Sequence, residues 1–289
     1  MNEDGPAFLI EQSAVYEAHK KETRAALDAA VGECFEAFHM ETPPPETLDV
    51  CTYCCARPEL EGEVRRTSQG EVTASQIEEY LSAARRGDQP SRGWTLFFLP
   101  RILELYARGQ EPSHIPEVGL MRIADLNWRQ TFPARQSKAL ETFALAWMRN
   151  LLTHYPWKQT DEGGFGALVT LALGGFDLQP LLDAWLTDIS PSATLNFIRD
   201  WSYEYFSEGA IRHPFLEEKS DIVAQLHEWI RSPIVRSSFY SRIMELDPAL
   251  VAAYEDNIVE WTFLNGKKPV EYISDFLAGT ADLPEKEEQ

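Results

Sequence analysis

Basic residues are scarce in this chain. Its 289 residues include 26 Lys and Arg against 46 Asp and Glu, which gives a formal net charge of −20. A chain this acidic repels phosphate, so we expect no general nucleic-acid binding and no docking on anionic lipid. Hydrophobic residues still make up 44% of the sequence and aromatic residues 11%. This composition predicts a folded protein with a sizeable core, because disordered acidic chains contain few aromatics.

Long apolar runs are also absent. No segment approaches the roughly 20 consecutive apolar residues of a membrane-spanning helix. The first residues, Met1 to Gly5, carry Glu3 and Asp4 instead of the basic residues that begin a secretory signal. We therefore expect a cytoplasmic protein.

Cysteine is nearly missing and is confined to the first fifth of the chain. A disulfide-bonded secreted protein would spread its bridges over the whole fold, so this clustering favours a reducing compartment. The cysteines are Cys34, Cys51, Cys54 and Cys55.

The cysteine cluster has some metal-ligand character. Cys51 and Cys54 form a single C-x-x-C pair, and Cys55, His39 or Cys34 could complete a tetrahedral zinc site. A second C-x-x-C pair, which a typical zinc module contains, is lacking. The plainer interpretation is therefore a protein without a cofactor. A bound zinc ion is the alternative interpretation.

Cys34 also fits the core of a helix. Leu27, Val31, Cys34 and Phe38 recur at three- and four-residue spacing, which places them on one apolar face. That pattern predicts a buried thiol at Cys34, since free cysteine behaves as a small hydrophobic residue.

Alternation of polar and apolar residues, the pattern of a half-buried strand, is not sustained anywhere. Helical spacing recurs instead, with a capping box at Thr73 and Gln76 and an N-cap followed by proline at Ser190-Pro191. A helix is predicted over 95–107, with Pro100 in its first turn. We expect an all-α protein, either an irregular multi-helix bundle or a degenerate HEAT-like stack of helical hairpins.

The predicted organisation has three segments. Residues 1–72 hold a long amphipathic helix (14–39) and a Pro- and Cys-rich connection. Residues 73–281 form the helical core domain, and residues 282–289 are a frayed acidic tail.

The usual catalytic signatures are missing. The stretch Gly163 to Gly166 lacks the Lys-Ser/Thr ending of a phosphate-binding loop, and it is expected to let the chain turn into a helix. His227-Glu228 is not followed by the second histidine of a zinc protease, and no G-x-S-x-G elbow occurs. We expect a protein that is not an enzyme. An enzyme with a site assembled from dispersed acidic residues remains an alternative.

Acidic residues are concentrated in one part of the chain. Residues 92–158 contain nine Lys or Arg and five Asp or Glu. Residues 160–230 contain only three Lys or Arg but twelve Asp or Glu. Asp200, Glu204 and Glu208 recur every four residues, which predicts one carboxylate face opposite the apolar face of the same helix. This face is either ordinary solvated surface or a docking ridge for a basic protein partner. Asp183 and Asp188 are assigned to the same predicted binding surface.

Two segments carry a family resemblance. They are Leu-Asp-Val-Cys-Thr-Tyr-Cys-Cys at 48–55, after a Pro-rich stretch, and Thr-Leu-Phe-Phe-Leu-Pro-Arg-Ile-Leu-Glu-Leu at 95–105. They resemble a family of uncharacterised bacterial proteins that share a C-x-x-C segment and a Phe-Leu-Pro-Arg helix start. That resemblance implies no activity and no catalytic residues.

The whole profile is similar to that of immunity proteins encoded beside type VI secretion effectors. Those proteins are cytoplasmic, often acidic and helical, and they bind a toxic nuclease domain. The likeness rests on class-level features. It implies an antitoxin that neutralises a basic secreted toxin, with a zinc-stabilised helical regulatory scaffold as the runner-up.

Overall fold

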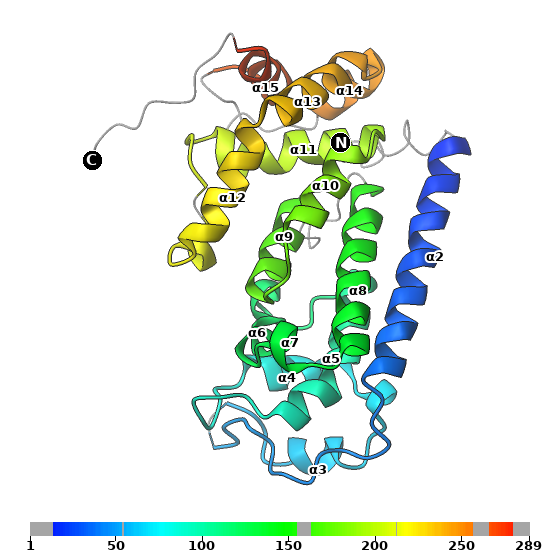
Figure 1. Cartoon of the computed structure of the whole chain (residues 1–289), viewed down its shortest axis with the longest axis vertical. Helices are drawn as coiled ribbons and strands as arrows, with labels where there is room; N and C mark the ends of the chain where they lie inside the picture. Colours follow the sequence, from blue (N-terminus) through cyan, green and yellow to red (C-terminus); the bar gives the residue numbers. More distant parts are fainter. Residues whose placement is uncertain (1–13, 54, 155–162, 212, 257–265, 280–289) are drawn as a thin grey trace. The chain divides into compact units, whose positions relative to one another are not determined.

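The computed structural model describes residues 14–53, 55–154, 163–211, 213–256 and 266–279 (Figure 1). Within these ranges the chain forms helices and turns but no strand, and an isolated β-bridge joins Val50 to Arg85. The predicted all-α, multi-helix fold is confirmed. Over the same ranges, no helix combines the length and the apolar character needed to cross a bilayer.

The chain divides into two compact units whose residues interleave along the sequence. Unit 1 comprises the described residues of Met1–Thr23, Met148–Val169 and Gln179–Gln289, and unit 2 comprises Arg24–Trp147 and Thr170–Leu178. Three helices, α2 (Ala14–Ala37), α8 (Ala134–Leu152) and α9 (Gly164–Leu173), contribute residues to both. The units do not coincide with the predicted segments 1–72 and 73–281, because packing brings together stretches that are distant in sequence. The predicted tail lies outside the described residues.

Unit 2 is built around one strongly apolar helix, α5 (Arg92–Ala107), which the side chain of Ser91 caps by accepting a hydrogen bond from Trp94 N. Trp94, Phe97 and Phe98 are fully buried, and the rings of Trp94 and Phe98 stack at 5.7 Å. The other elements of unit 2 are α3 (Leu60–Val64), η1 (Gln69–Glu71), α4 (Ala74–Ser82), η2 (Pro116–Val118), α6 (Met121–Asp125) and α7 (Trp128–Thr131). The predicted capping box at Thr73 and Gln76 begins α4, as the sequence indicates.

Pro100 lies in the interior of α5, so its predicted place in the first turn is wrong: the helix begins three residues earlier than expected, at Arg92. A proline inside a helix has no N–H for the carbonyl four residues back, here Leu96 O. The buried side-chain amide of Gln69 donates to Leu96 O at 3.3 Å and to Phe97 O at 3.0 Å. It also donates to Phe38 O at 3.0 Å, just beyond the end of α2. A glutamine 31 residues upstream thus repairs the hydrogen bonding that the proline interrupts.

Unit 1 has an aromatic core. Its elements are α10 (Gln179–Thr187), α11 (Pro191–Trp201), η3 (Ser202–Phe206), η4 (Pro214–Leu216), α12 (Ser220–Arg231), α13 (Pro233–Glu245), α14 (Pro248–Glu255) and α15 (Pro269–Ala278). Phe197 of α11 stacks on Phe239 of α13 at 3.7 Å, and Trp201 lies 5.3 Å from Trp229 of α12. Large rings from three helices therefore fill the centre of the unit.

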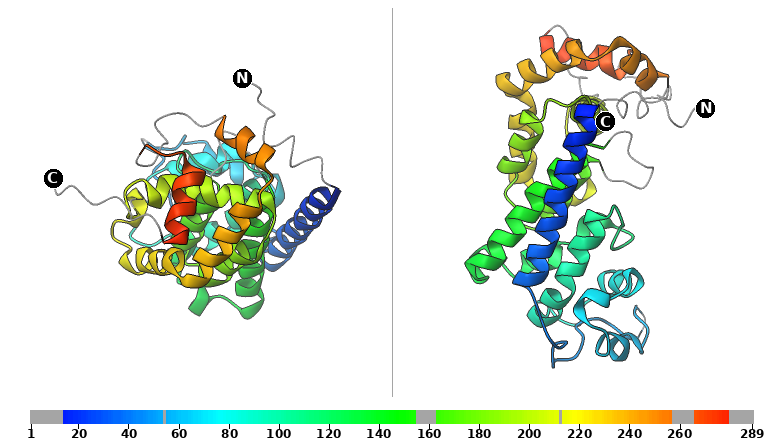
Figure 2. Two further views of the ribbon diagram at one scale, coloured as in Figure 1. Left: turned by 90° about the horizontal axis from the view of Figure 1, so that it is seen from above. Right: turned by 90° about the vertical axis from the view of Figure 1, so that its right-hand side faces the viewer.

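Helices α13 and α15 lie side by side (Figure 2). Arg236 of α13 donates to Phe276 O at 2.7 Å, and its guanidinium lies over the Phe276 ring. The guanidinium pairs with a carbonyl in the last turn of α15, where a cation is favoured by the helix dipole.

We predict that Gln69→Leu lowers the free energy of unfolding by about 1–3 kcal/mol, because it leaves buried carbonyls without donors. Pro100→Ala supplies an N–H to Leu96 O, so the same glutamine substitution should cost less in that background. Urea unfolding of the two single variants and the double variant measures this coupling. Gln136→Leu is the matched control, since the Gln136 amide donates to the helix-end carbonyl Ala37 O, at 3.1 Å, which the proline does not affect. Equal costs of Gln69→Leu in both backgrounds would contradict the proposed repair.

Candidate functional site

The predicted acidic ridge begins on α11, whose start agrees with the sequence. The Ser190 hydroxyl accepts a hydrogen bond from Ala193 N at 3.2 Å, and Pro191 occupies the first helical position. The predicted apolar face is confirmed, because all four of its residues are fully buried: Leu195, Ile198, Trp201 and Tyr205.

The helix does not continue as an α-helix through the ridge. Residues Ser202–Phe206 form a π-helical turn, in which Ser207 N donates to Ser202 O, five residues back, at 3.0 Å. A π turn accommodates an additional residue, so it shifts the angular position of everything that follows. The four-residue spacing of Asp200, Glu204 and Glu208 therefore no longer places them on one face.

Asp200 is buried, with 7% of its surface exposed. Its carboxylate accepts from Arg199 Nε at 2.9 Å and from the main-chain N–H of Phe165 at 3.1 Å. Phe165 lies in the first turn of α9, where main-chain N–H groups have no partner within the helix. The expectation that Asp200 projects from an exposed face is wrong, because its carboxylate serves as a cap for another helix.

Two glycines at the start of α9, Gly163 just before the helix and Gly164 as its first residue, leave room for close neighbours. A Cβ atom on Gly163 would lie 2.6 Å from Asp200 Oδ2, and one on Gly164 would lie 2.9 Å from the Trp185 ring. At either position, a residue larger than glycine could be accommodated only if these neighbours shifted. The glycine-rich stretch starts a helix, as the sequence indicates, and it does so against a buried carboxylate.

Burial raises the pKa of the Asp200 carboxyl above its ordinary value. The Arg199 guanidinium and the amides of Phe165 and Gly164 act in the opposite direction, because they stabilise the charged form. Burial is the larger effect, so the folded protein holds the Asp200 proton more tightly than the unfolded chain does.

The remaining part of the predicted ridge is at the surface. Glu208 is exposed and Glu204 is half-buried. Tyr205 and Phe206, which lie between the two glutamates along the chain, are buried in the core. Tyr203, which precedes Glu204, is 69% exposed. Sequence reasoning missed Tyr203, whose only signal was its place one residue before Glu204. We name Tyr203, Glu204 and Glu208 the π-turn surface. An aromatic ring beside carboxylates suits Lys and Arg side chains, through cation–π contact and ion pairing.

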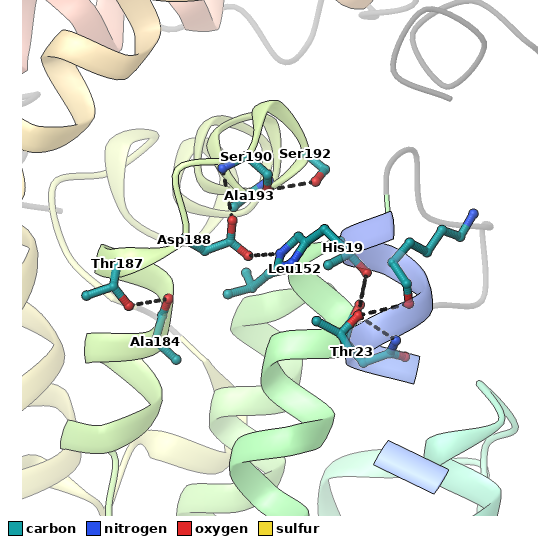
Figure 3. Close-up of polar contacts among 12 residues, drawn as sticks. His19, Thr23, Leu152, Ala184, Thr187, Asp188, Ser190, Ser192 and Ala193 are labelled. Atoms are coloured by element: carbon teal, nitrogen blue, oxygen red, sulfur yellow. Dashed lines mark hydrogen bonds and ion pairs between the residues drawn. The ribbon is translucent and has the colours of Figure 1, made fainter. Parts of the chain in front are cut away.

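Asp183 and Asp188, the other two predicted binding residues, have different surroundings. Asp183 is exposed on α10 and accepts from Gln179 Nε2 at 2.8 Å. The Asp188 side chain is only 10% exposed and lies 3.3 Å from Nε2 of His19. Its other oxygen accepts from Ser190 N at 2.9 Å (Figure 3). The structure thus leaves Asp183 at the surface and engages Asp188 in the turn before α11.

The side chains around Asp188 form a chain of polar contacts. In Figure 3, Asp188 lies between His19 and Ser190, and the Ser190 hydroxyl is 3.0 Å from that of Ser192. Ser190 also caps α11, as described above, and Ser192 is fully buried. These contacts join the start of α2 to the turn between α10 and α11. They also provide an intramolecular partner for each oxygen of the Asp188 carboxylate.

The buried-thiol interpretation of Cys34 is confirmed. The residue is fully buried on the apolar face of α2, and its thiol donates to Ala139 O at 3.5 Å. Burial, with a smaller contribution from Glu33, raises the pKa of the Cys34 thiol to about 12. A thiol that resists ionisation is a poor zinc ligand, because the metal binds the thiolate.

Among the other predicted metal ligands, Cys51 directly follows the bridged residue Val50. Cys51 N donates to Ala84 O at 2.7 Å, while Cys55 and His39 are exposed. No three His, Cys, Asp or Glu side chains are grouped to hold a metal among the residues that the structure describes. Cys54 lies outside those residues, so the zinc site at Cys51, Cys54, Cys55 and His39 stays a prediction.

Comparison with protein-family models, with curated proteins and with solved structures finds no match to this chain.

Asp200 should make stability depend on pH in a defined direction. A carboxyl whose pKa is raised on folding contributes stability that is present below its unfolded value of about 3.9 and is lost as the pH rises through the folded value. Asp200→Asn keeps the shape without the titration. We expect the free energy of unfolding of the parent, relative to that of the Asn variant, to fall as the pH rises above about 4.

Urea unfolding of both proteins across this range is the measurement. Asp183→Asn, which changes an exposed carboxylate on the same unit, is the matched control and should show no comparable trend. A parent that instead gains stability over Asp200→Asn as the pH rises would mean that the Arg199 ion pair outweighs burial.

Proposed function

We propose that this chain is a non-enzymatic protein that binds and neutralises a basic protein partner, and that the π-turn surface contacts this partner. The observation that carries the proposal is the exposed ring of Tyr203 in a segment whose neighbouring carboxylates, Glu204 and Glu208, reach the surface. Tyrosine is enriched among the residues that dominate binding energy at protein interfaces.

The charge distribution supports a basic partner. Acidic residues outnumber basic ones twelve to three over residues 160–230, which include the π-turn surface. Domains that grip phosphate are commonly basic, and a toxic nuclease of the type VI class has this property. An acidic inhibitor attracts such a domain over a distance and accelerates association.

The packing beneath the π-turn surface supports a rigid binding site. Tyr205 and Phe206, which flank the exposed side chains, are fully buried, and the Tyr205 hydroxyl accepts from Arg231 Nε at 2.8 Å. Side chains held on a packed element lose less entropy on binding than those on a flexible loop. The surface is therefore prepared for its partner before contact.

The test compares charge reversal at two places. The partner tested is the product of the neighbouring gene. Glu204→Lys with Glu208→Lys should slow its association with this chain and reduce the protection of cells that produce it. Asp88→Lys with Glu111→Lys is the matched control: it makes the same change in net charge at exposed positions of unit 2. Tyr203→Ala should weaken binding by about 1–2 kcal/mol or more, mainly through faster dissociation.

Binding is measured at low and high salt. The parent complex should weaken as salt rises, since long-range attraction between the acidic chain and a basic partner is screened. Equal affinities for the reversal variant and its control would place the contact away from the π-turn surface. A neighbouring toxin that the parent does not bind would overturn the proposed function.

A further inference from the structure

The outer face of α13 is uncharged and largely apolar. Ile234, Tyr240 and Met244 are 68%, 36% and 63% exposed. Ser237 and Ser241, which lie between them on the same face, are exposed as well. On this face three turns of helix therefore present no charge to solvent, in a chain whose net charge is −20. An exposed stripe of this kind is typical of a protein–protein contact.

The opposite side of α13 carries the packing of this helix within unit 1. Val235, Phe239 and Ile243 are buried there. Arg236 caps α15, and Arg242 Nη1 donates to Asp188 O, beyond the end of α10, at 2.9 Å. The residues of the outer face lie about 100° to 220° around the helix from Phe239, the centre of this packed side, from the 100° turn per residue. They are not needed to hold α13 in place.

We propose that two copies of this chain associate through the outer faces of their α13 helices, which run antiparallel across a two-fold axis. A two-fold contact brings the same surface together from both copies, so the surface must complement itself. The order of side chains along α13 does so. With the centre of the helix, Phe239, on the axis, Ile234 of each copy faces Met244 of the other, and the small Ser237 faces the small Ser241.

The charges at the two ends of α13 complement each other in the same arrangement. Glu245 is exposed at the C-terminal end of the helix, and Arg231 is exposed immediately before its N-terminal end. The N-cap residue Ser232 makes no side-chain cap hydrogen bond. Antiparallel pairing places Glu245 of one copy near Arg231 and the N-terminus of α13 of the other, where the helix dipole favours a carboxylate.

A second copy fits this face better than other occupants do. A basic protein would gain little from a stripe without carboxylates, and an anionic membrane would be repelled by the net charge. Association of two copies is opposed by that same charge. It also rests on a helix only about 20 Å long, so the contact is smaller than a standard interface and should be weak. Screening should strengthen it, so the dimer should form more readily at high salt than at low salt.

The experiment measures mass against protein concentration by sedimentation velocity, at low and at high salt. We expect a monomer–dimer equilibrium that shifts toward the dimer with salt. Ile234→Glu with Met244→Glu should raise the dissociation constant of the dimer by about tenfold or more. Tyr53→Glu is the matched control, since Tyr53 is 96% exposed on unit 2 and should leave the equilibrium unchanged. Circular dichroism confirms that each variant is folded.

Charge reversal tests the antiparallel two-fold arrangement itself. Arg231→Glu alone places two carboxylates together at each end of the pair; it also removes the hydrogen bond from Arg231 Nε to the Tyr205 hydroxyl, so its fold is checked by circular dichroism. Glu245→Arg alone places two guanidinium groups together. Both variants should dimerise less than the parent. An equimolar mixture of the two should recover dimerisation, because a mixed pair matches opposite charges at both ends.

Three outcomes would overturn the proposal. The first is a parent that remains monomeric up to about 1 mM at both salt concentrations. The second is a dimer that the paired glutamate substitutions leave intact. The third is a mixture of the two charge variants that dimerises no better than either alone. None of these results depends on whether the π-turn surface binds a basic partner, and the opposite salt dependence separates the two contacts.

Discussion

The buried carboxylate of Asp200 is the constraint on which unit 1 depends. From the last turn of α11, it accepts a hydrogen bond from the main-chain N–H of Phe165 in the first turn of α9. It also requires a glycine at position 163, because a Cβ atom there would collide with the carboxylate oxygens. Immediately after Asp200 the chain enters a π turn, which determines which of the following side chains reach solvent. The π-turn surface therefore begins only three residues after this buried carboxylate.

Gln69 and Asp200 illustrate the same physical principle in the two units. Each is a polar side chain that satisfies a main-chain group on a helix far away in sequence: the Leu96 carbonyl, which Pro100 leaves without its helical donor, in unit 2, and the Phe165 amide of α9 in unit 1. Buried polar groups cost free energy unless they are hydrogen-bonded, so an apolar replacement at either position leaves a buried main-chain group without its partner. Glutamine and aspartate, which usually lie at the surface, are therefore part of the interior at these two positions.

The surface of unit 1 presents two contacts of different character. The π-turn surface combines a tyrosine with carboxylates and suits a basic partner, whereas the outer face of α13 has no charge over three turns and suits a copy of itself. Salt acts on them in opposite directions, since it screens an attraction in the first case and a repulsion in the second. The two proposals therefore predict opposite responses to ionic strength for two surfaces of the same unit.

The sequence by itself determined the all-α fold, the caps at Thr73 and Ser190, the buried face of α11 and the core position of Cys34. Each of these follows from spacing along a single helix, which is local information. Only the tertiary structure decided that Asp200 is buried, that Asp188 is engaged with His19, that Pro100 lies inside a helix and that Tyr203 is exposed. The reason is that each of these depends on a partner distant in sequence or on a π turn, and neither leaves a periodic signal.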